Sequence, residues 1–172
     1  MALVHVYTGD GKGKTTASLG LILRSLGWGR KVCMIQFIKG YSDIGEANFA
    51  KNNPDFTFIQ VSHTQKRDIK ENDVLTRKND AEEAFRIAER EIFSGKYDLV
   101  VLDEINCALH YDLLDIENVL SLIKNKPESL ELVLTGRDAK EEIIALADYV
   151  TEMKLIKHPY QKGIYAREGV DY

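Results

Sequence analysis

The stretch T-G-D-G-K-G-K-T, residues 8–15, contains the residue types that bind a polyphosphate. It follows the apolar run A-L-V-H-V-Y and precedes a segment with helical periodicity, so we expect a turn between a strand and a helix. Such a turn places several backbone N–H groups around one concavity at the positive end of the helix dipole. Glycines at positions 9, 11 and 13 let the backbone come close to an anion. We therefore interpret residues 8–15 as a phosphate-binding loop.

The side chains of this loop have distinct expected roles. Lys14 supplies a positive charge to the phosphates, and the hydroxyl group of Thr15 is a candidate ligand for Mg²⁺. Lys12 is a second cation, which either contacts phosphate or points into solvent. Thr8 stands where such loops usually begin with glycine, which alters the entry of the loop more than its phosphate contacts. The residues expected to surround the nucleotide are Thr8, Gly9, Asp10, Gly11, Lys12, Gly13, Lys14, Thr15 and Thr16.

Two carboxylates end a second apolar segment, Y-D-L-V-V-L-D-E at residues 97–104. We expect this segment to be a strand that lies beside the first one, so that Asp103 reaches a metal ion directly or through water. Glu104 is a second candidate metal ligand. The alternative for both residues is an acidic cap at a strand end with no role in binding.

A third polar strand end is predicted at residues 132–138, L-V-L-T-G-R-D. Open α/β proteins bind their ligands at the carboxyl ends of the strands, where Thr135 and Arg137 would lie. Arg137 is therefore expected to contact the outer phosphates. A surface ion pair is the alternative for Arg137.

Composition sets the broad class. The chain has 172 residues, of which 44% are hydrophobic, so one domain spanning residues 1–172 is expected. A net charge of -4 and a pI near 5.6 give no general attraction to nucleic acid or to anionic membranes. Neither a secretion signal nor an apolar run long enough for a bilayer is visible, which favours a soluble cytoplasmic protein. Cys33 and Cys107 are expected to be reduced packing residues.

Short apolar runs alternate with longer helical segments, as in parallel strands joined by crossover helices. We predict an α/β, P-loop NTPase-like (RecA-like) single domain with a mostly parallel sheet and helices on both faces. The predicted helices are residues 14–26, 80–93, 115–123 and 138–146, with Asp115 and Asp138 as N-caps. Residues 62–79 are predicted to be a long surface connection. The predicted strands are residues 3–7, 31–37, 56–61, 99–102, 132–134 and 149–153.

Five motifs occur in one order along the chain: Y-T-G-D-G-K-G-K-T-T, Q-F-I-K-G at residues 36–40, V-L-D-E at 101–104, L-T-G-R at 134–137 and K-H-P-Y-x-x-G-I at 157–164. This ordered set resembles the ATP:corrinoid adenosyltransferases of the CobA/CobO/BtuR type. The likeness runs from about residue 3 to the closing E-G-V-D-Y. The combination of the first and last motifs is its most specific part.

The resemblance implies an enzyme that moves the 5′-deoxyadenosyl group of ATP onto the cobalt of a reduced corrinoid and releases the whole triphosphate. Lys14 and Arg137 would then be the catalytic residues that stabilise charge on the departing triphosphate, with Mg²⁺ held by Thr15, Asp103 and Glu104. The nucleophile would be the Co(I) centre, so no side chain is needed in that role. Family membership also implies a homodimer and an electron-donating reductase or flavoprotein.

The sequence departs from the family pattern in two places. Many members carry a helical extension before the first strand, and many carry a Phe-Thr-Trp stretch after the third strand. Here the first strand begins at once, and the second region reads S-H-T-Q-K-R. His63 in this region is expected to be a solvated loop residue; a cobalt ligand is the alternative. His158 is expected to belong to a turn fixed by Pro159, with Tyr160 packed against the sheet.

Two other functions share the same loop. A small kinase or NTPase would use Lys14, Thr15 and Asp103 for phosphoryl transfer. A nucleotide-dependent switch would bind a corrinoid without chemistry. The three hypotheses differ in their products.

Overall fold

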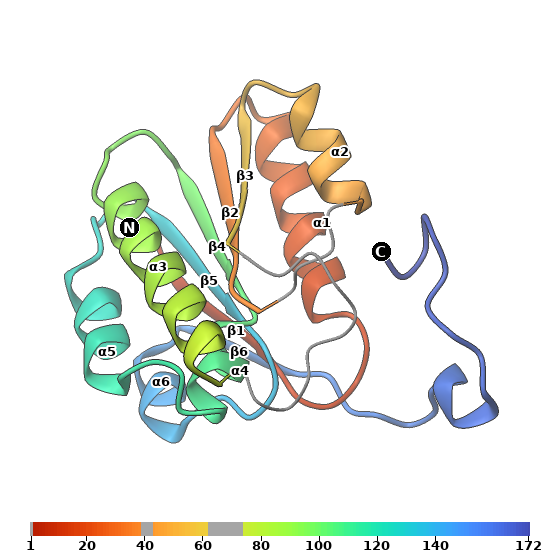
Figure 1. The fold of residues 1–172 in the computed structure, drawn as a ribbon. Helices are drawn as coiled ribbons and strands as arrows, with labels where there is room; N and C mark the ends of the chain where they lie inside the picture. Colours follow the sequence, from red (N-terminus) through yellow and green to blue (C-terminus); the bar gives the residue numbers. More distant parts are fainter. Residues whose placement is uncertain (1, 39–42, 62–73) are drawn as a thin grey trace.

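A parallel sheet with helices on both faces forms the centre of the protein (Figure 1). The computed structural model describes residues 2–38, 43–61 and 74–172. The predicted α/β class is confirmed. The strands are β1 (Val4–Thr8), β2 (Val32–Gln36), β3 (Phe56–Gln60), β4 (Leu99–Asp103), β5 (Glu131–Thr135) and β6 (Tyr149–Glu152). The helices are α1 (Lys14–Gly27), α2 (Gly45–Lys51), α3 (Val74–Ile92), α4 (Ile105–His110), α5 (Ile116–Asn125), α6 (Glu141–Leu146) and the 3₁₀ helix η1 (Pro159–Lys162).

The order of the strands corrects one expectation. The described sheet runs β3-β2-β4-β5-β1-β6, and every pairing in it is parallel. The prediction that β4 lies beside β1 is therefore wrong, because β5 lies between them. All carboxyl ends still meet at one edge, since the strands are parallel. The tips of β1, β5 and β4 thus lie in a row at this edge, followed by those of β2 and β3.

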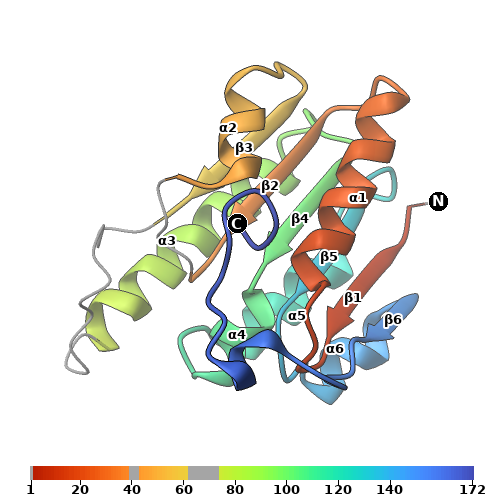
Figure 2. The same cartoon turned by 90° about the vertical axis from the view of Figure 1, so that its right-hand side faces the viewer.

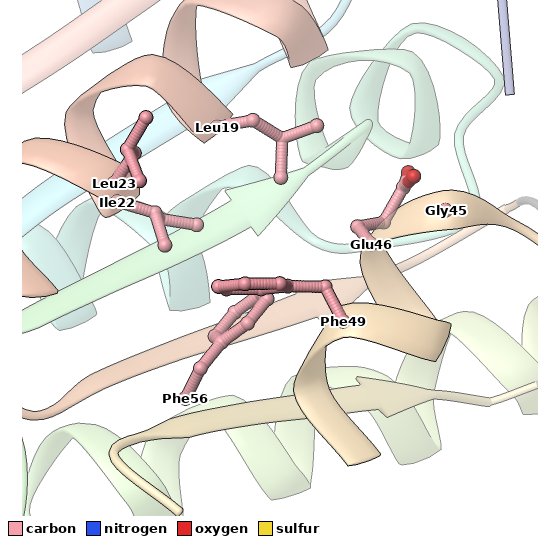
Figure 3. A pocket seen from close by; sticks show the side chains of 7 residues that line it. All are labelled: Leu19, Ile22, Leu23, Gly45, Glu46, Phe49 and Phe56. Atoms are coloured by element: carbon pink, nitrogen blue, oxygen red, sulfur yellow. The ribbon is translucent and has the colours of Figure 1, made fainter. Parts of the chain in front are cut away.

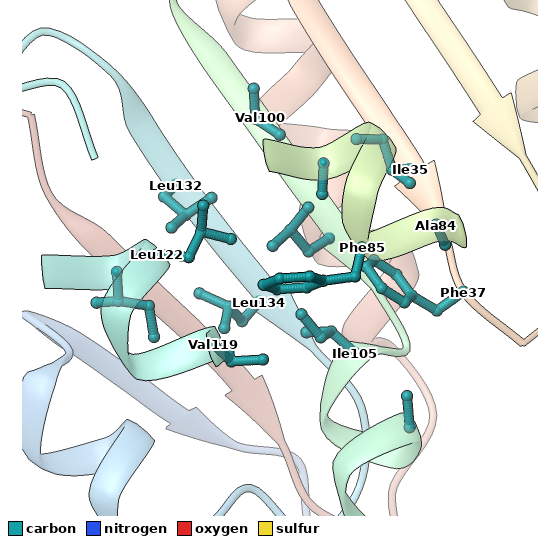
Figure 4. Packing of buried hydrophobic residues seen from close by; sticks show 14 of the residues in the cluster. Ile35, Phe37, Ala84, Phe85, Val100, Ile105, Val119, Leu122, Leu132 and Leu134 are labelled. Carbon is teal, nitrogen blue, oxygen red and sulfur yellow. The ribbon is translucent and has the colours of Figure 1, made fainter. Parts of the chain in front are cut away.

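Burial of the central strands explains their composition. Every residue of β2 and of β4 is buried, as expected for continuously apolar strands that are covered on both faces. One apolar cluster packs strand residues such as Val100 and Leu134 against Phe85 of α3 and Val119 of α5 (Figure 4). A second, smaller cluster packs Ile22 of α1 onto the opposite face. The sheet is therefore held in place from both sides.

The ends of several helices differ from their predicted positions. α3 begins at Val74, so residues 74–79 belong to a helix and not to the predicted surface connection, while residues 62–73 lie outside the described ranges. The Asp115 side chain accepts a hydrogen bond from the Glu117 N–H at 2.9 Å, which confirms that N-cap. Asp138 is not a cap, because α6 begins at Glu141. The short helices α2, α4 and η1 were not predicted, since one or two turns give little periodicity to detect.

The C-terminal segment runs along the carboxyl edge of the sheet (Figure 2). It leaves β6, which is exposed along its whole length, passes through η1, and turns back toward the phosphate-binding loop at Asp171. Within the described ranges, none of the helices combines the length and the apolar character that a membrane span requires. The edge of the sheet that carries the loop is therefore bordered by the last residues of the chain.

Candidate functional site: a phosphate-binding loop and a buried carboxylate

The glycine-rich loop between β1 and α1 passes close to another part of the backbone. Gly11 N–H donates to the carbonyl oxygen of Met153 at 2.6 Å, and Met153 N–H donates to that of Thr8 at 2.8 Å. A Cβ atom at Gly9 or at Gly11 would lie 2.6 Å from the same Met153 oxygen. Gly9 and Gly13 also have positive φ angles, 92° and 122°. Contact with the chain that follows β6 is thus one physical reason for glycine in this loop.

The ammonium group of Lys14 lies inside the curve of the loop. Its Nζ donates to the carbonyl oxygens of Gly9 at 2.6 Å and Gly11 at 2.8 Å. Lys14 is 9% exposed, and this burial lowers the pKa of its ammonium group, while the negative charge of Glu104 opposes the shift. A cation that is held here by neutral carbonyls alone is well suited to exchange them for phosphate oxygens.

Thr15 and Asp103 come together at the start of α1. The Thr15 hydroxyl donates to Asp103 Oδ1 at 3.0 Å, although the two residues are 88 positions apart in sequence. Asp103 has no exposed surface. Two of the three residues predicted as metal ligands are therefore neighbours, even though β5 separates β4 from β1.

Two further side chains hold Asp103, a role that was not predicted for either of them. Thr135 donates to Asp103 Oδ1 at 2.7 Å, and Gln36 donates through Nε2 to Oδ2 at 2.9 Å. Both donors are fully buried at the ends of β5 and β2. Hydrogen bonds of this kind are what make a buried carboxylate tolerable. The signal in the sequence was a polar residue at the end of each apolar strand.

Glu104 has a left-handed backbone conformation, with a φ of 65°. Its N–H donates to Thr135 Oγ1 at 3.0 Å, and its carboxylate accepts a hydrogen bond from Cys107 Sγ at 2.8 Å. Cys107 in turn accepts one from the Arg137 N–H at 3.2 Å. Cys107 therefore connects the tips of β4 and β5 and is more than the packing residue that was predicted. Cys33, which is fully buried, fits that prediction.

The remaining charges of the loop lie at the surface. Arg137 is exposed, and its Nε is 3.9 Å from Asp10 Oδ1. Lys12 pairs with the Asp171 carboxylate and with the carbonyl oxygen of Val170. Hydrogen bonds from Lys12 and then from Arg167 lower the pKa of the Asp171 carboxyl group. In this structure Lys12 contacts the C-terminal segment rather than pointing freely into solvent.

The other predicted residues have simpler surroundings. Thr8 is buried and its hydroxyl accepts from the Ala139 N–H at 3.2 Å, whereas Thr16 is exposed. His158 Nδ1 accepts a hydrogen bond from the Tyr160 N–H at 3.2 Å, which confirms a turn here. The packing expected for Tyr160 is wrong, because the side chain is 69% exposed. His63 and the last two residues of the Q-F-I-K-G motif lie outside the described ranges.

A separate hollow lies between α1 and α2 (Figure 3). It has a volume of about 240 Å³ and an almost wholly apolar lining. Its side chains include Leu23 of α1, which is 66% exposed. The hollow has none of the charges of the phosphate-binding loop. Its lining residues are Leu19, Ile22, Leu23, Gly45, Glu46, Phe49 and Phe56.

Thr15 and Asp103 offer oxygen atoms of the kind that bind a magnesium ion. No group of three or more His, Cys, Asp or Glu side chains able to hold a metal occurs in the described ranges. Mg²⁺ is usually bound by one or two protein oxygens together with phosphate oxygens and water. A hydroxyl oxygen and a carboxylate oxygen 3.0 Å apart beside a phosphate-binding loop fit this requirement.

The parallel sheet and the loop between β1 and α1 have the arrangement of a P-loop NTPase-like fold. A solved structure with the same fold is EssC (ATPases 2 and 3) from Geobacillus thermodenitrificans, with a TM-score of 0.51 and 11% identity. The match covers 99% of this chain but only 35% of that one, and at this identity it speaks for the fold alone.

Comparison with protein families and with characterised proteins gives the narrower assignment. Residues 1–172 match the family described as ATP:corrinoid adenosyltransferase BtuR/CobO/CobP. A corrinoid adenosyltransferase of Sinorhizobium sp. is 40% identical, with 99% of this chain and 80% of that protein covered. One from Escherichia coli (strain K12) is 34% identical over 99% of this chain and 85% of that protein. The chain belongs to this enzyme family.

The contact between the loop and Met153 can be tested by adding a methyl group. Gly11→Ala is expected to lower the free energy of unfolding by about 1–3 kcal/mol, because its Cβ would lie too close to the Met153 carbonyl. The control is Gly20→Ala, where the added carbon meets nothing within 4 Å and helix propensity favours alanine. Urea unfolding of both variants is the measurement. Equal stability of the two would contradict the close approach.

Cys107 is expected to react slowly with alkylating reagents. Burial and then the hydrogen bond to Glu104 raise the pKa of its thiol from 9.0 to about 12, and only the thiolate is the nucleophile. At pH 8 we expect alkylation roughly 100- to 1,000-fold slower than for an unhindered thiol, since a unit of pKa is a factor of ten in thiolate. Mass spectrometry after iodoacetamide treatment measures it. Glu104→Gln should speed the alkylation. Fast alkylation of Cys107 in the unaltered protein would contradict the raised pKa of its thiol.

Proposed function

We propose that this protein transfers the 5′-deoxyadenosyl group of ATP to the Co(I) centre of a reduced corrinoid and releases triphosphate. Its membership of the corrinoid adenosyltransferase family supports the reaction. The observation that carries the binding mode is the Lys14 ammonium group, which lies inside the loop beside the Thr15–Asp103 pair. A cation, a hydroxyl and a carboxylate at one sheet edge are what an ATP polyphosphate and its magnesium ion require.

In this proposal the phosphate-binding loop holds the triphosphate part of ATP. The first N–H groups of α1 have no acceptor within the helix, so they can donate to phosphate oxygens. Lys14 leaves the carbonyls of Gly9 and Gly11 to contact the phosphates, and Arg137 adds charge from the tip of β5. Residues 8–16 form the remainder of the cradle.

A magnesium ion would be held by Thr15 and Asp103. When bound, it would neutralise charge on the phosphates and so stabilise the leaving group. The Thr15 hydroxyl donates to Asp103 Oδ1 at 3.0 Å, which places one oxygen of each side chain at the same point of the site. We assign Glu104 the role of a nearby negative charge, because Cys107 already orients its carboxylate.

The chemistry then asks little of the side chains beyond position and charge. An electron pair of Co(I) forms the bond to C5′, the C5′–O bond breaks, and its electron pair leaves with the triphosphate. The cobalt is oxidised formally by two electrons, and the substrate itself supplies the nucleophile. Lys14 and Arg137 stabilise the negative charge that gathers on the leaving group. Alignment of cobalt with C5′ is the other contribution, and it can amount to several kcal/mol.

The family relationship extends the proposal to the setting of the reaction. A reduced corrinoid has to be supplied, so we propose a flavoprotein or another reductase as electron donor. Cytoplasmic location and a homodimeric assembly complete the proposal. These three statements are supported by the family resemblance and not by any contact in the structure.

The products of the reaction separate this proposal from its alternatives. Incubation with ATP, Mg²⁺ and chemically reduced cobalamin is expected to give intact triphosphate and a light-sensitive Co–C bond. The control omits the reductant and should give neither product. Release of ADP would favour a small kinase or NTPase. Tight ATP binding without turnover of reduced cobalamin would favour a nucleotide-dependent switch.

Lys14 is expected to be required for turnover. Lys14→Ala should lower the rate of triphosphate release by at least about 100-fold, the usual loss when one group that stabilises developing charge is removed. Lys124→Ala is the control, because this lysine is exposed in the last turn of α5 and does not belong to the loop. Initial rates at saturating reduced corrinoid give the comparison. A Lys14→Ala variant as active as Lys124→Ala would exclude the proposed role.

A further inference from the structure

Three strand tips carry a continuous chain of side-chain hydrogen bonds. Gln60 Nε2 donates to Gln36 Oε1 at 2.7 Å, and Gln36 Nε2 donates to Asp103 Oδ2 at 2.9 Å. The three residues are direct neighbours in the sheet, since Gln36 pairs in register with Gln60 of β3 and with Asp103 of β4. We call this chain of side chains the glutamine relay.

The direction of the relay is set by its charged end. A carboxylate only accepts hydrogen bonds, so the amide NH₂ group of Gln36 has to face Asp103. The carbonyl of Gln36 therefore faces Gln60, which has to present its own NH₂ group. Gln60 thus restricts Gln36 to the orientation in which it can hold the carboxylate.

The two oxygens of Asp103 consequently have different partners. Oδ2 accepts from Gln36, whereas Oδ1 accepts from Thr15 and Thr135. Holding Oδ2 fixes the rotation of the carboxylate about its last bond, which keeps Oδ1 on the side of the phosphate-binding loop. A neutral amide holds the carboxylate without cancelling its negative charge. A lysine or an arginine at position 36 would cancel that charge.

We propose that Gln36 is a positioning residue for the magnesium ion of MgATP, acting through Asp103, and that Gln60 supports it. Groups that orient a metal ligand from behind commonly change metal affinity by about 10- to 100-fold when removed. The inference rests on the proposed function only in assigning Mg²⁺ to Thr15 and Asp103. It requires no statement about the corrinoid.

The experiment measures ATP binding by calorimetry while Mg²⁺ is varied, without corrinoid. Gln36→Met keeps the length of the side chain but has no donor. It is expected to raise the Mg²⁺ concentration that gives half of the magnesium-dependent gain in affinity by about 10- to 100-fold. Affinity for ATP without Mg²⁺ should stay unchanged. Asp103→Asn shows how large the effect is when the proposed metal ligand is removed altogether. Gln60→Met should raise the same Mg²⁺ concentration, but by less than about tenfold.

Several results would overturn the inference. One is a folded Gln36→Met variant with an unaltered Mg²⁺ dependence; another is an equal loss of ATP affinity with and without Mg²⁺. Should Gln36→Met fail to fold, the Gln60→Met variant decides, because it keeps the hydrogen bond from Gln36 to Asp103. If ATP binding by Gln60→Met then depends on Mg²⁺ as it does in the unaltered protein, the relay is refuted. ATP binding of the unaltered protein that ignores Mg²⁺ would also refute it.

A functional readout separates positioning from mere structural support. In Gln36→Met, saturating Mg²⁺ should restore the rate of adenosyl transfer, whereas a distorted fold would lower that rate at every Mg²⁺ concentration. Absence of adenosyl transfer in the unaltered protein would sink the proposed reaction, yet it would leave the binding measurement intact. The two proposals can therefore fail independently.

Discussion

The carboxylate of Asp103 is the constraint on which the site depends. A buried charge is tolerated only when hydrogen-bond donors surround it, and here the donors come from Thr15, Gln36 and Thr135. These residues begin α1, end β2 and end β5, respectively. The hydrogen bonds to the Asp103 carboxylate therefore fix the position of α1 on the sheet. The hydrogen bonds that make this buried carboxylate tolerable thus also produce the arrangement that we propose for a magnesium polyphosphate.

The position of β5 between β1 and β4 matters for the same reason. Thr135, at the tip of β5, donates to Asp103 and accepts from the Glu104 N–H. The left-handed turn at Glu104 is thereby tied to the neighbouring strand, and Cys107 adds a second link to the Arg137 backbone. The intervening strand thus supplies the bridge between the loop and its acidic partner, and direct pairing of β1 with β4 is not needed.

Local patterns in the sequence predicted much of this structure. Features that depend on pairing between distant segments were not predicted. The six strands and the loop were recognisable because their signals lie within a few consecutive residues. The order of strands depends on contacts between distant segments, so β4 was placed one position wrongly. Gln36 looked like the polar end of an ordinary strand, since nothing in its neighbourhood in the sequence reveals that Asp103 lies beside it. Short helices such as α2, which has no buried residue, were missed because one or two turns give little periodicity to detect.

The spacing of glycines in the loop has a second cause besides access for an anion. Gly9 and Gly11 lie against the backbone at Met153, which leaves no room for a Cβ atom at either position. The hydrogen bonds of Met153 with Gly11 and Thr8 are backbone contacts, whereas the pair of Lys12 with Asp171 is partly exposed and screened by solvent. The extension of β6, more than the terminal ion pair, therefore holds the loop in shape. A loop held in this way is preorganised, so the polyphosphate that we propose as its ligand would not have to order it first.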